Sequence, residues 1–312
     1  MNVQWLTGRR KWGAASAGML TAVLFAFSGT ASAGIAETRH NLGTGSAFNG
    51  TPNAGNNNST GTAEICVFCH TPHGASQGAP APLWNKRLSV NGVPTGGSGT
   101  YTTYAQLRTP SLDGQVAQVG SVSAACLSCH DGTQAMDNII NAPGSGGYNA
   151  DGGTNGTRGW TWAGATVSAN GFMQNAGDRI SMLGTDLSND HPIGIQYCGG
   201  GIDSAGAGSC KDKDFKAVSS DTINGNLVFW VDTGGTGKQR TDLPLYVADR
   251  RLAGETGSTT TTVTGPLVEC ASCHDPHVSE GQAGPVNGVN SGATFLRISN
   301  ANSAVCTSCH VK

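Results

Sequence analysis

The sequence predicts a chain that is mostly coil, with short helices, a few short β-strands and no conventional aliphatic core. Of its 312 residues, 47 are glycine and only 12% are charged, against a usual charged share of about 25%. Such a chain is poor in helix formers and cannot easily fill an interior with side chains alone. The third observation is one short motif, C-x-x-C-H, that recurs four times.

The expected elements are few and short. A helix is predicted near residues 102–104, running towards residue 108, and a helical turn at 123–129. The run Asn-Leu-Val-Phe-Trp-Val at 226–231 is the best strand, with 244–247 as its antiparallel partner and 259–267 as a third β-prone run. A Gly- and Asn-rich stretch at 143–171 marks the expected boundary between two halves, at about 34–150 and 160–312.

The N-terminus predicts an exported protein. Basic residues at 9–11, an apolar run at 12–27 and Ala-Ser-Ala at 31–33 indicate that residues 1–33 are a cleaved secretory signal peptide. A membrane anchor is the alternative, but the apolar run is short and rich in glycine and alanine. Cleavage removes three cationic residues, so the formal charge falls from −2 to −5. No transmembrane segment is expected after cleavage, and an acidic chain is not expected to bind nucleic acid.

Each C-x-x-C-H motif predicts covalent attachment of a c-type haem. The two thiols bind the haem vinyl groups, and the adjacent histidine supplies the proximal iron ligand. Zinc binding and a disulfide-rich scaffold are the alternatives, but neither requires a histidine after every second cysteine. We call residues 66–70 site 1, 126–130 site 2, 270–274 site 3 and 306–310 site 4. The expected cofactors are four haem c groups, bound by Cys66, Cys69, Cys126, Cys129, Cys270, Cys273, Cys306 and Cys309, with His70, His130, His274 and His310 as proximal ligands.

The remaining histidines complete a ligand count. Four irons with two histidines each need four distal ligands, and the chain has four more histidines: His40, His73, His191 and His277. His73 and His277 lie three residues beyond a proximal histidine, too close to ligate the same iron, so each is free to ligate a neighbouring haem. A lone histidine in a loop is more often just exposed, but the matching count favours the distal assignment. Bis-histidine ligation predicts low-potential haems.

The two halves repeat one order of motifs. Each has a leading histidine, then a C-x-x-C-H-x-P-H site, then a plain C-x-x-C-H site, which indicates an internal duplication. By this duplication we expect His73 to serve site 2 and His277 to serve site 4. His40 and His191 would then serve sites 1 and 3.

Cys198 and Cys210 are not followed by histidine. In an oxidising compartment they are expected to form a disulfide closing a loop of about a dozen residues, worth roughly 3 kcal/mol in the loop-entropy model. A redox-active pair is the alternative.

Several runs resemble the doubled-CxxCH multihaem cytochromes, and within that group the OmcE-type tetrahaem subunits of extracellular cytochrome filaments. They are C-V-F-C-H-T-P-H-G at 66–74, L-W-N at 83–85, C-L-S-C-H-D-G at 126–132, D-H-P-I at 190–193, L-P-L-Y at 243–246, E-C-A-S-C-H-D-P-H at 269–277 and L-R-I-S-N at 296–300. The resemblance covers most of residues 34–312, apart from Gly-rich stretches near 87–100, 143–171 and 199–209.

The resemblance implies a multihaem cytochrome c fold, dominated by loops and wrapped around a chain of four haems. It also implies head-to-tail polymerisation, a heterologous contact that does not close. Such filaments can donate a distal histidine from one subunit to the next, and His40 is the candidate here. Ligation within the subunit is equally compatible with the sequence.

The sequence therefore predicts an electron-transfer protein and not an enzyme, because every iron is expected to be six-coordinate. We expect it outside the cell or at the cell surface, otherwise in the periplasm, as the repeating subunit of a conductive filament. Its expected partners are copies of itself, other redox proteins and extracellular electron acceptors. A monomeric periplasmic or cell-surface shuttle with the same haems is one alternative, and a multihaem reductase with an open haem site is another.

Overall fold

The computed structural model describes most of the chain beyond the predicted signal peptide. The described residues are 34–45, 47–48, 51–52, 57–76, 81–88, 100–144, 146–149, 158–176, 181–190, 192–247, 250–253, 261–277, 285–286, 289–290 and 295–311. Residues 34–312 form one compact unit, separate from Met1–Ala33. The predicted signal peptide and His191 lie outside the described residues.

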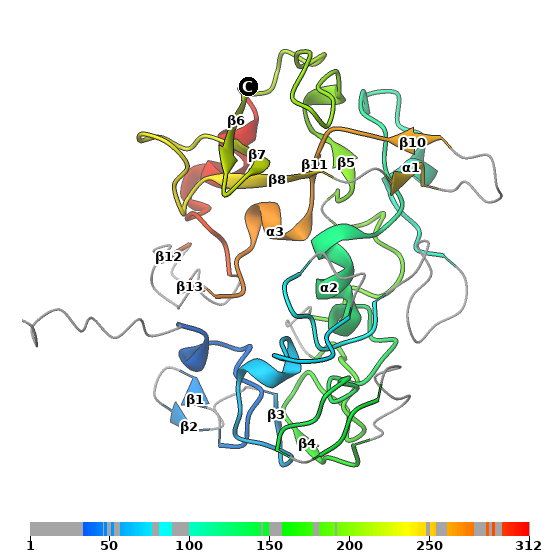
Figure 1. The fold of residues 1–312 in the computed structure, drawn as a ribbon, viewed down its shortest axis with the longest axis vertical. Helices are drawn as coiled ribbons and strands as arrows, with labels where there is room; N and C mark the ends of the chain where they lie inside the picture. The colour runs from blue at the N-terminus through cyan, green and yellow to red at the C-terminus, as the bar shows by residue number, and fades with distance from the viewer. Residues whose placement is uncertain are drawn as a thin grey trace, which may run out of the picture. The chain divides into compact units, whose positions relative to one another are not determined.

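Helices are short wherever the structure describes them (Figure 1). The α-helices are α1 (Tyr104–Leu107), α2 (Ser121–His130), α3 (Cys270–Cys273) and α4 (Ala304–Cys309), and the 3-10 turns are η1 (Gly34–Glu37), η2 (Cys66–Phe68), η3 (Tyr197–Gly199) and η5 (Ala301–Ser303). Helix α1 begins at a capping box made by Thr103 and Gln106, which satisfies free N–H groups of its first turn. Both helices predicted in the first half, near 102–108 and at 123–129, are confirmed.

A five-stranded sheet is the largest regular element. Its order is β5 (Ile195–Gln196), β11 (Pro266–Val268), β8 (Leu243–Val247), β7 (Asn226–Val231) and β6 (Val218–Ile223), and every neighbouring pair is antiparallel. The predicted pairing of 226–231 with 244–247 is confirmed. The third β-prone run contributes β10 (Thr262–Val263) and β11, while its first residues, 259–260, are not described.

Strand β6 was not predicted, although its turn carries a clear signal. Asn224 and Gly225 join β6 to β7 and both have positive φ, 52° and 78°. Asn-Gly in this conformation is the favoured two-residue hairpin turn, because its twist matches that of the strands.

The other strands have two residues each and form antiparallel pairs. These are β1 (Ala47–Phe48) with β2 (Thr51–Pro52), β3 (Asn58–Ser59) with β4 (Trp162–Ala163), β9 (Arg250–Arg251) with β10, and β12 (Pro285–Val286) with β13 (Val289–Asn290). The β3–β4 pair joins the first half to residues at the expected start of the second.

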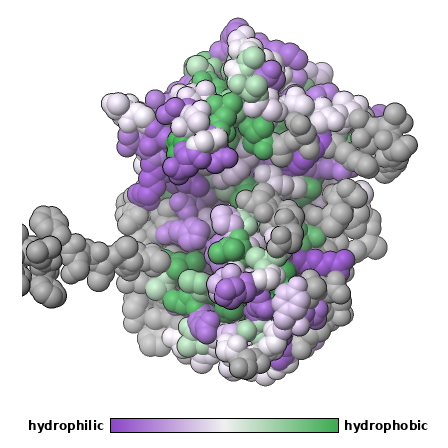
Figure 2. Space-filling view, viewed as in Figure 1, coloured by the Kyte–Doolittle hydropathy of each residue, from purple (hydrophilic) through white to green (hydrophobic). Residues whose placement is uncertain are grey.

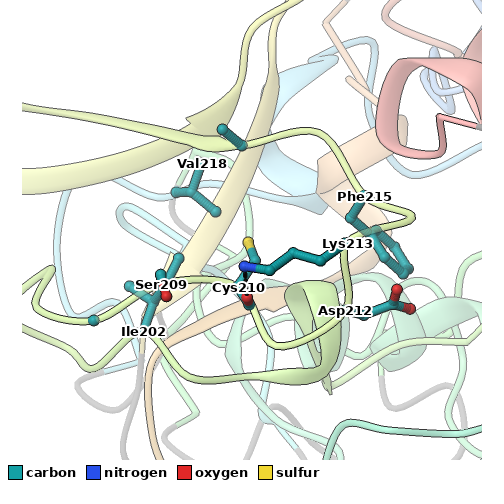
Figure 3. Close-up of a pocket in the computed structure, with 9 residues that line it drawn as sticks. Ile202, Ser209, Cys210, Asp212, Lys213, Phe215 and Val218 are labelled. Carbon is teal, nitrogen blue, oxygen red and sulfur yellow. Dashed lines mark hydrogen bonds between the residues drawn. The ribbon is translucent and has the colours of Figure 1, made fainter.

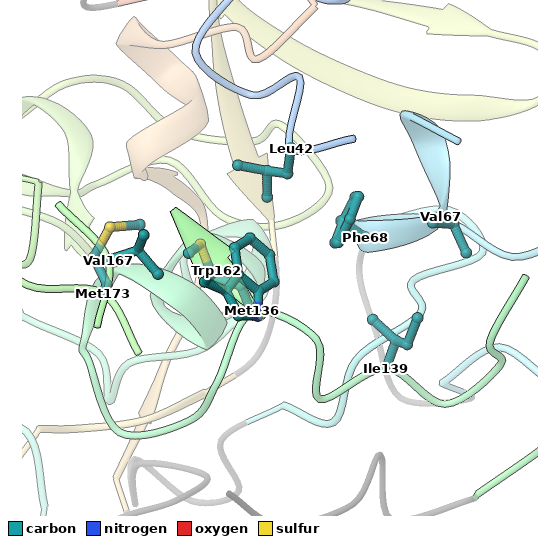
Figure 4. Packing of buried hydrophobic residues seen from close by; sticks show 8 residues of the cluster. All are labelled: Leu42, Val67, Phe68, Met136, Ile139, Trp162, Val167 and Met173. Atoms are coloured by element: carbon teal, nitrogen blue, oxygen red, sulfur yellow. The ribbon is translucent and has the colours of Figure 1, made fainter. Parts of the chain in front are cut away.

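Hydrophobic side chains do form cores, which corrects the expectation of no conventional aliphatic core. One cluster contains Leu42, Val67, Phe68, Met136, Ile139, Trp162, Val167 and Met173 (Figure 4). A second lies on the sheet, where β7 and β8 bring Phe229 and Val231 together with Leu243 and Leu245. On the face shown in Figure 2, hydrophobic residues gather in patches between hydrophilic ones. The clusters are small and separate, so the core is divided among the segments that carry the motifs.

Candidate functional site

All four C-x-x-C-H motifs adopt one helical turn. Site 1 lies on η2, site 2 at the end of α2, site 3 on α3 and site 4 on α4. In sites 1, 3 and 4 the histidine N–H donates to the carbonyl of the first cysteine, at 2.7, 3.0 and 2.9 Å. A helical turn puts residues three and four apart on one face, so both thiols and the following histidine are presented on the same side.

The sites follow one another in chain order. Cys69 of site 1 and Cys129 of site 2 are close enough to interact electrostatically, and both border the Phe68 cluster. The thiols of Cys126 and Cys270 are hydrogen-bonded to each other, which links site 2 to site 3. Cys273 in turn interacts electrostatically with Cys309 of site 4. The motifs are therefore arranged as a series and not scattered over the surface.

A buried polar network joins sites 2 and 3. The Glu269 carboxylate accepts a hydrogen bond of 2.5 Å from the Ser123 hydroxyl of α2 and pairs with Arg250. The same hydroxyl accepts the N–H of Cys270 at 3.0 Å, at the start of α3. Helix α3 also contacts β8, and in Figure 1 it lies between the sheet and α2. No sequence motif indicates this network, because its members are far apart in the chain.

Two proximal histidines are held in one tautomer. The Nδ1 of His70 donates to the carbonyl of Pro82 at 2.7 Å, and the Nδ1 of His130 donates to the carbonyl of Ser181 at 2.6 Å. Metal-ligating histidines commonly use one ring nitrogen in this way, which fixes the ring and frees the other nitrogen for the metal.

The structure brings two predicted distal histidines to proximal ones. The ring centroids of His40 and His130 are 6.1 Å apart, and those of His70 and His277 are 6.0 Å apart. This differs from the pairing expected from the duplication, in which His40 serves site 1 and His277 serves site 4. The duplication orders the motifs along the chain, but the folded contacts between the halves decide which rings meet.

Exposure does not separate the paired histidines from the others. His73, His274 and His310 are exposed, and so is His277, whose side chain is 59% exposed. The His310 ring packs on Phe215 at 4.3 Å between centroids. Within the described residues, no histidine ring lies beside His73 or His310. The placement of His191 is not described, so the predicted roles of His73 and His191 stay predictions.

Burial sets the protonation of the ligand candidates. Burial, followed by the charge of His130, lowers the pKa of His40 to about 3. Burial also lowers the pKa of His130, so both rings are neutral near neutral pH, the form that binds metals. Burial raises the pKa of Cys69 to about 12 and that of Cys309 to about 12, which keeps these thiols protonated when no cofactor is attached.

The paired histidines can be compared with what a haem requires. A haem iron needs only two protein ligands, since the porphyrin supplies the other four. In the described part of the chain no three His, Cys, Asp or Glu side chains converge on a possible ion site, whereas histidines meet in twos. Beside His70, at 5.7 Å between centroids, the buried indole N–H of Trp84 has no acceptor within the described residues. A donor of this kind suits a haem carboxylate.

Sites 1 and 3 share an antiparallel bridge that the sequence did not reveal, formed by His70 with Trp84 and by His274 with Leu296. After site 1, the N–H of Thr71 donates to Leu83 and that of Asn85 donates to Cys69, at 2.9 and 2.8 Å. After site 3, the N–H of Asp275 donates to Phe295 and that of Arg297 donates to Cys273, at 2.7 and 2.8 Å.

Leu83 and Phe295, each one residue before the bridged Trp84 or Leu296, both have positive φ, 53° and 55°. This conformation is unusual for bulky residues and costs of order 1–3 kcal/mol. The same bridge, with a strained residue at the same place, recurs at both C-x-x-C-H-x-P-H sites, as a duplication would produce.

The expected disulfide lies beside site 4. Cys198 and Cys210 are joined, with Cα atoms 5.3 Å apart. A partly open cavity of about 320 Å³ borders this bridge (Figure 3). Lys213, which lines it, donates to the carbonyl of Cys210 at 2.7 Å, and Phe215 forms another wall. None of the C-x-x-C-H residues lines this cavity, but its wall residue Phe215 packs on His310 of site 4.

Comparison with protein-family models, with curated proteins and with solved structures finds no match to this chain. Among the described residues, no helix combines the length and apolar character needed to cross a membrane.

Proposed function

We propose that the protein is a tetrahaem c-type cytochrome that carries electrons outside the cell. One observation carries the proposal: four C-x-x-C-H motifs each lie on a helical turn, and neighbouring sites lie close together in chain order. Close spacing is what electron transfer between redox groups requires. A fold wrapped around four haems, with two histidines on each iron, is the arrangement this series of sites best supports.

The chain's own residues would hold and tune the cofactor. Haem supplies a one-electron Fe(III)/Fe(II) couple. The cysteine pairs anchor it, and the carbonyls of Pro82 and Ser181 keep His70 and His130 in the ligating tautomer. The carboxylate of Asp275, 3.4 Å from the Nδ1 of His277, raises the basicity of that ring. Saturated irons leave no open position for substrate, which favours electron transfer over catalysis.

Pyridine haemochrome analysis of the secreted protein tests this proposal. We expect four haems per chain and an EPR spectrum of the oxidised protein without high-spin iron. Three or fewer haems would refute the tetrahaem assignment. Four haems of which one is high-spin at rest would instead favour the reductase, because a reductase needs an open iron.

We also propose that the protein polymerises head to tail into a filament, on the strength of the resemblance to filament subunits. Negative-stain electron microscopy of the secreted fraction tests this directly. Filaments are the expected result, and uniform single particles at every concentration would favour the monomeric shuttle. The microscopy result does not test the number of haems per chain.

A further inference from the structure

We propose that His277, from the second half of the chain, ligates the iron of site 1, and that His40 ligates the iron of site 2. The inference rests on the proposed haem function and names the ligands within it. It replaces the pairing expected from the duplication, which sends His277 to site 4 and His40 to site 1.

The first argument is the distance between the two rings of each histidine pair. Two imidazoles on opposite sides of one iron have metal–nitrogen bonds of about 2.0 Å each, which puts their centres about 6 Å apart. The His70–His277 and His40–His130 centroids are 6.0 and 6.1 Å apart. These separations are compatible with one metal atom between the rings. Edge-to-face pairs such as Phe68 with Trp160 lie at a similar 5.9 Å, so the assignment also depends on the ring nitrogens.

The second argument is that each ring has one imidazole nitrogen left for the metal. In each pair both rings have an acceptor beside them: Pro82 for His70, Ser181 for His130, Asp275 for His277 and the carbonyl of Pro276 for His40. A ring that donates from one nitrogen offers the lone pair of the other, so each pair can provide two neutral ligands.

The third argument concerns His40 and whether it ligates a haem of its own subunit. It is half-buried in its own chain, stacked on Phe295 and hydrogen-bonded to the segment between His274 and His277. These contacts hold its ring towards His130 of the same chain, 6.1 Å away between centroids. His40 therefore acts within the subunit, and His73 and His191 are the histidines left for sites 3 and 4.

The test removes the haem of site 1 and then, in separate variants, replaces His277 or His40. In a Cys66→Ser/Cys69→Ser background, which should hold three low-spin haems, His277→Ala should add no high-spin iron because its haem is already gone. In the same background His40→Ala should convert one haem to high spin. The duplication pairing predicts the reverse for both variants, and that result in EPR spin counts would overturn the proposal. His40→Ala also serves as the matched control that a lost ligand is detectable.

A second measurement uses the full chain, in case the three-haem background does not fold. In His277→Ala, the new high-spin iron should broaden the NMR signals of Trp84, which lies beside His70. If His277 instead serves site 4, broadening should appear at Phe215, beside His310, and the proposal fails. A wild-type protein with fewer than four haems would be a failure of the proposed function and not of this pairing.

Discussion

The ion pair between Glu269 and Arg250 predicts how strongly sites 2 and 3 depend on each other. The Glu269 side chain is fully buried, and that of Arg250 is only 12% exposed. Glu269→Gln keeps the volume but removes the charge, leaving the Arg250 guanidinium with the carbonyl of Gln118 at 3.0 Å. Breaking one side of a buried pair costs about 3–5 kcal/mol. The remaining hydrogen bond and partial exposure of Arg250 place the expected loss near the lower end, at about 3 kcal/mol.

Guanidinium unfolding followed by far-UV circular dichroism measures this loss. With a slope of about 4 kcal/mol per M, the midpoint should fall by about 0.7 M. The exposed Glu64→Gln is the matched control and should leave the midpoint unchanged. Combining Glu269→Gln with Arg250→Met should cost less than the sum of the single changes, because no unpaired charge remains. A midpoint shift below about 0.2 M for Glu269→Gln would refute the reasoning.

Three further changes follow from the described contacts. His40→Ala should give one high-spin haem in four by EPR and leave filaments visible by negative stain, since the ring faces His130 of its own chain; loss of filaments would point to ligation between subunits. Cys198→Ser with Cys210→Ser should lower the unfolding free energy by about 3 kcal/mol while all four haems are retained by haemochrome assay. The pKa of Asp275 is lowered to about 2, first by its hydrogen bond with His277, so its stabilisation is present above its ordinary pKa and lost as pH falls towards 2. Asp275→Asn should abolish this acid-dependent loss, at most about 2 kcal/mol for a partly exposed group, in unfolding measured between pH 5 and about 2; an unchanged pH profile would contradict it.

Local signals in the sequence predicted local structure well. The helix predicted near 102–108 is α1, and the β-branched and aromatic residues of 226–231 form β7, which pairs with β8. The disulfide partners were also clear, because Cys198 and Cys210 are the two cysteines outside the C-x-x-C-H motifs. These features depend on residues that are near in the chain or unique in type.

The contacts that build the site are of a different kind. Nothing near His277 in the sequence indicates that it meets His70, because their approach depends on how α3 packs on α2 and β8. The hydrophobic clusters were missed because their members are single residues drawn from separate loops, so no run or period marks them. The positive φ of Leu83 and Phe295 had no sequence signal either, since the conformation is one that bulky residues rarely adopt.

The nearness of His70 to His277 also bears on how the protein is made. If the chain is exported from its N-terminus, Cys66 and Cys69 become available for haem attachment before residue 277 emerges. Under the proposed ligation, the haem of site 1 receives its second ligand, His277, only when the last third of the chain arrives. Until then its iron can bind small molecules such as carbon monoxide, and this reactivity disappears when the C-terminal part folds into place. A six-coordinate iron at site 1 would therefore indicate that the C-terminal part of the chain has been exported and has folded.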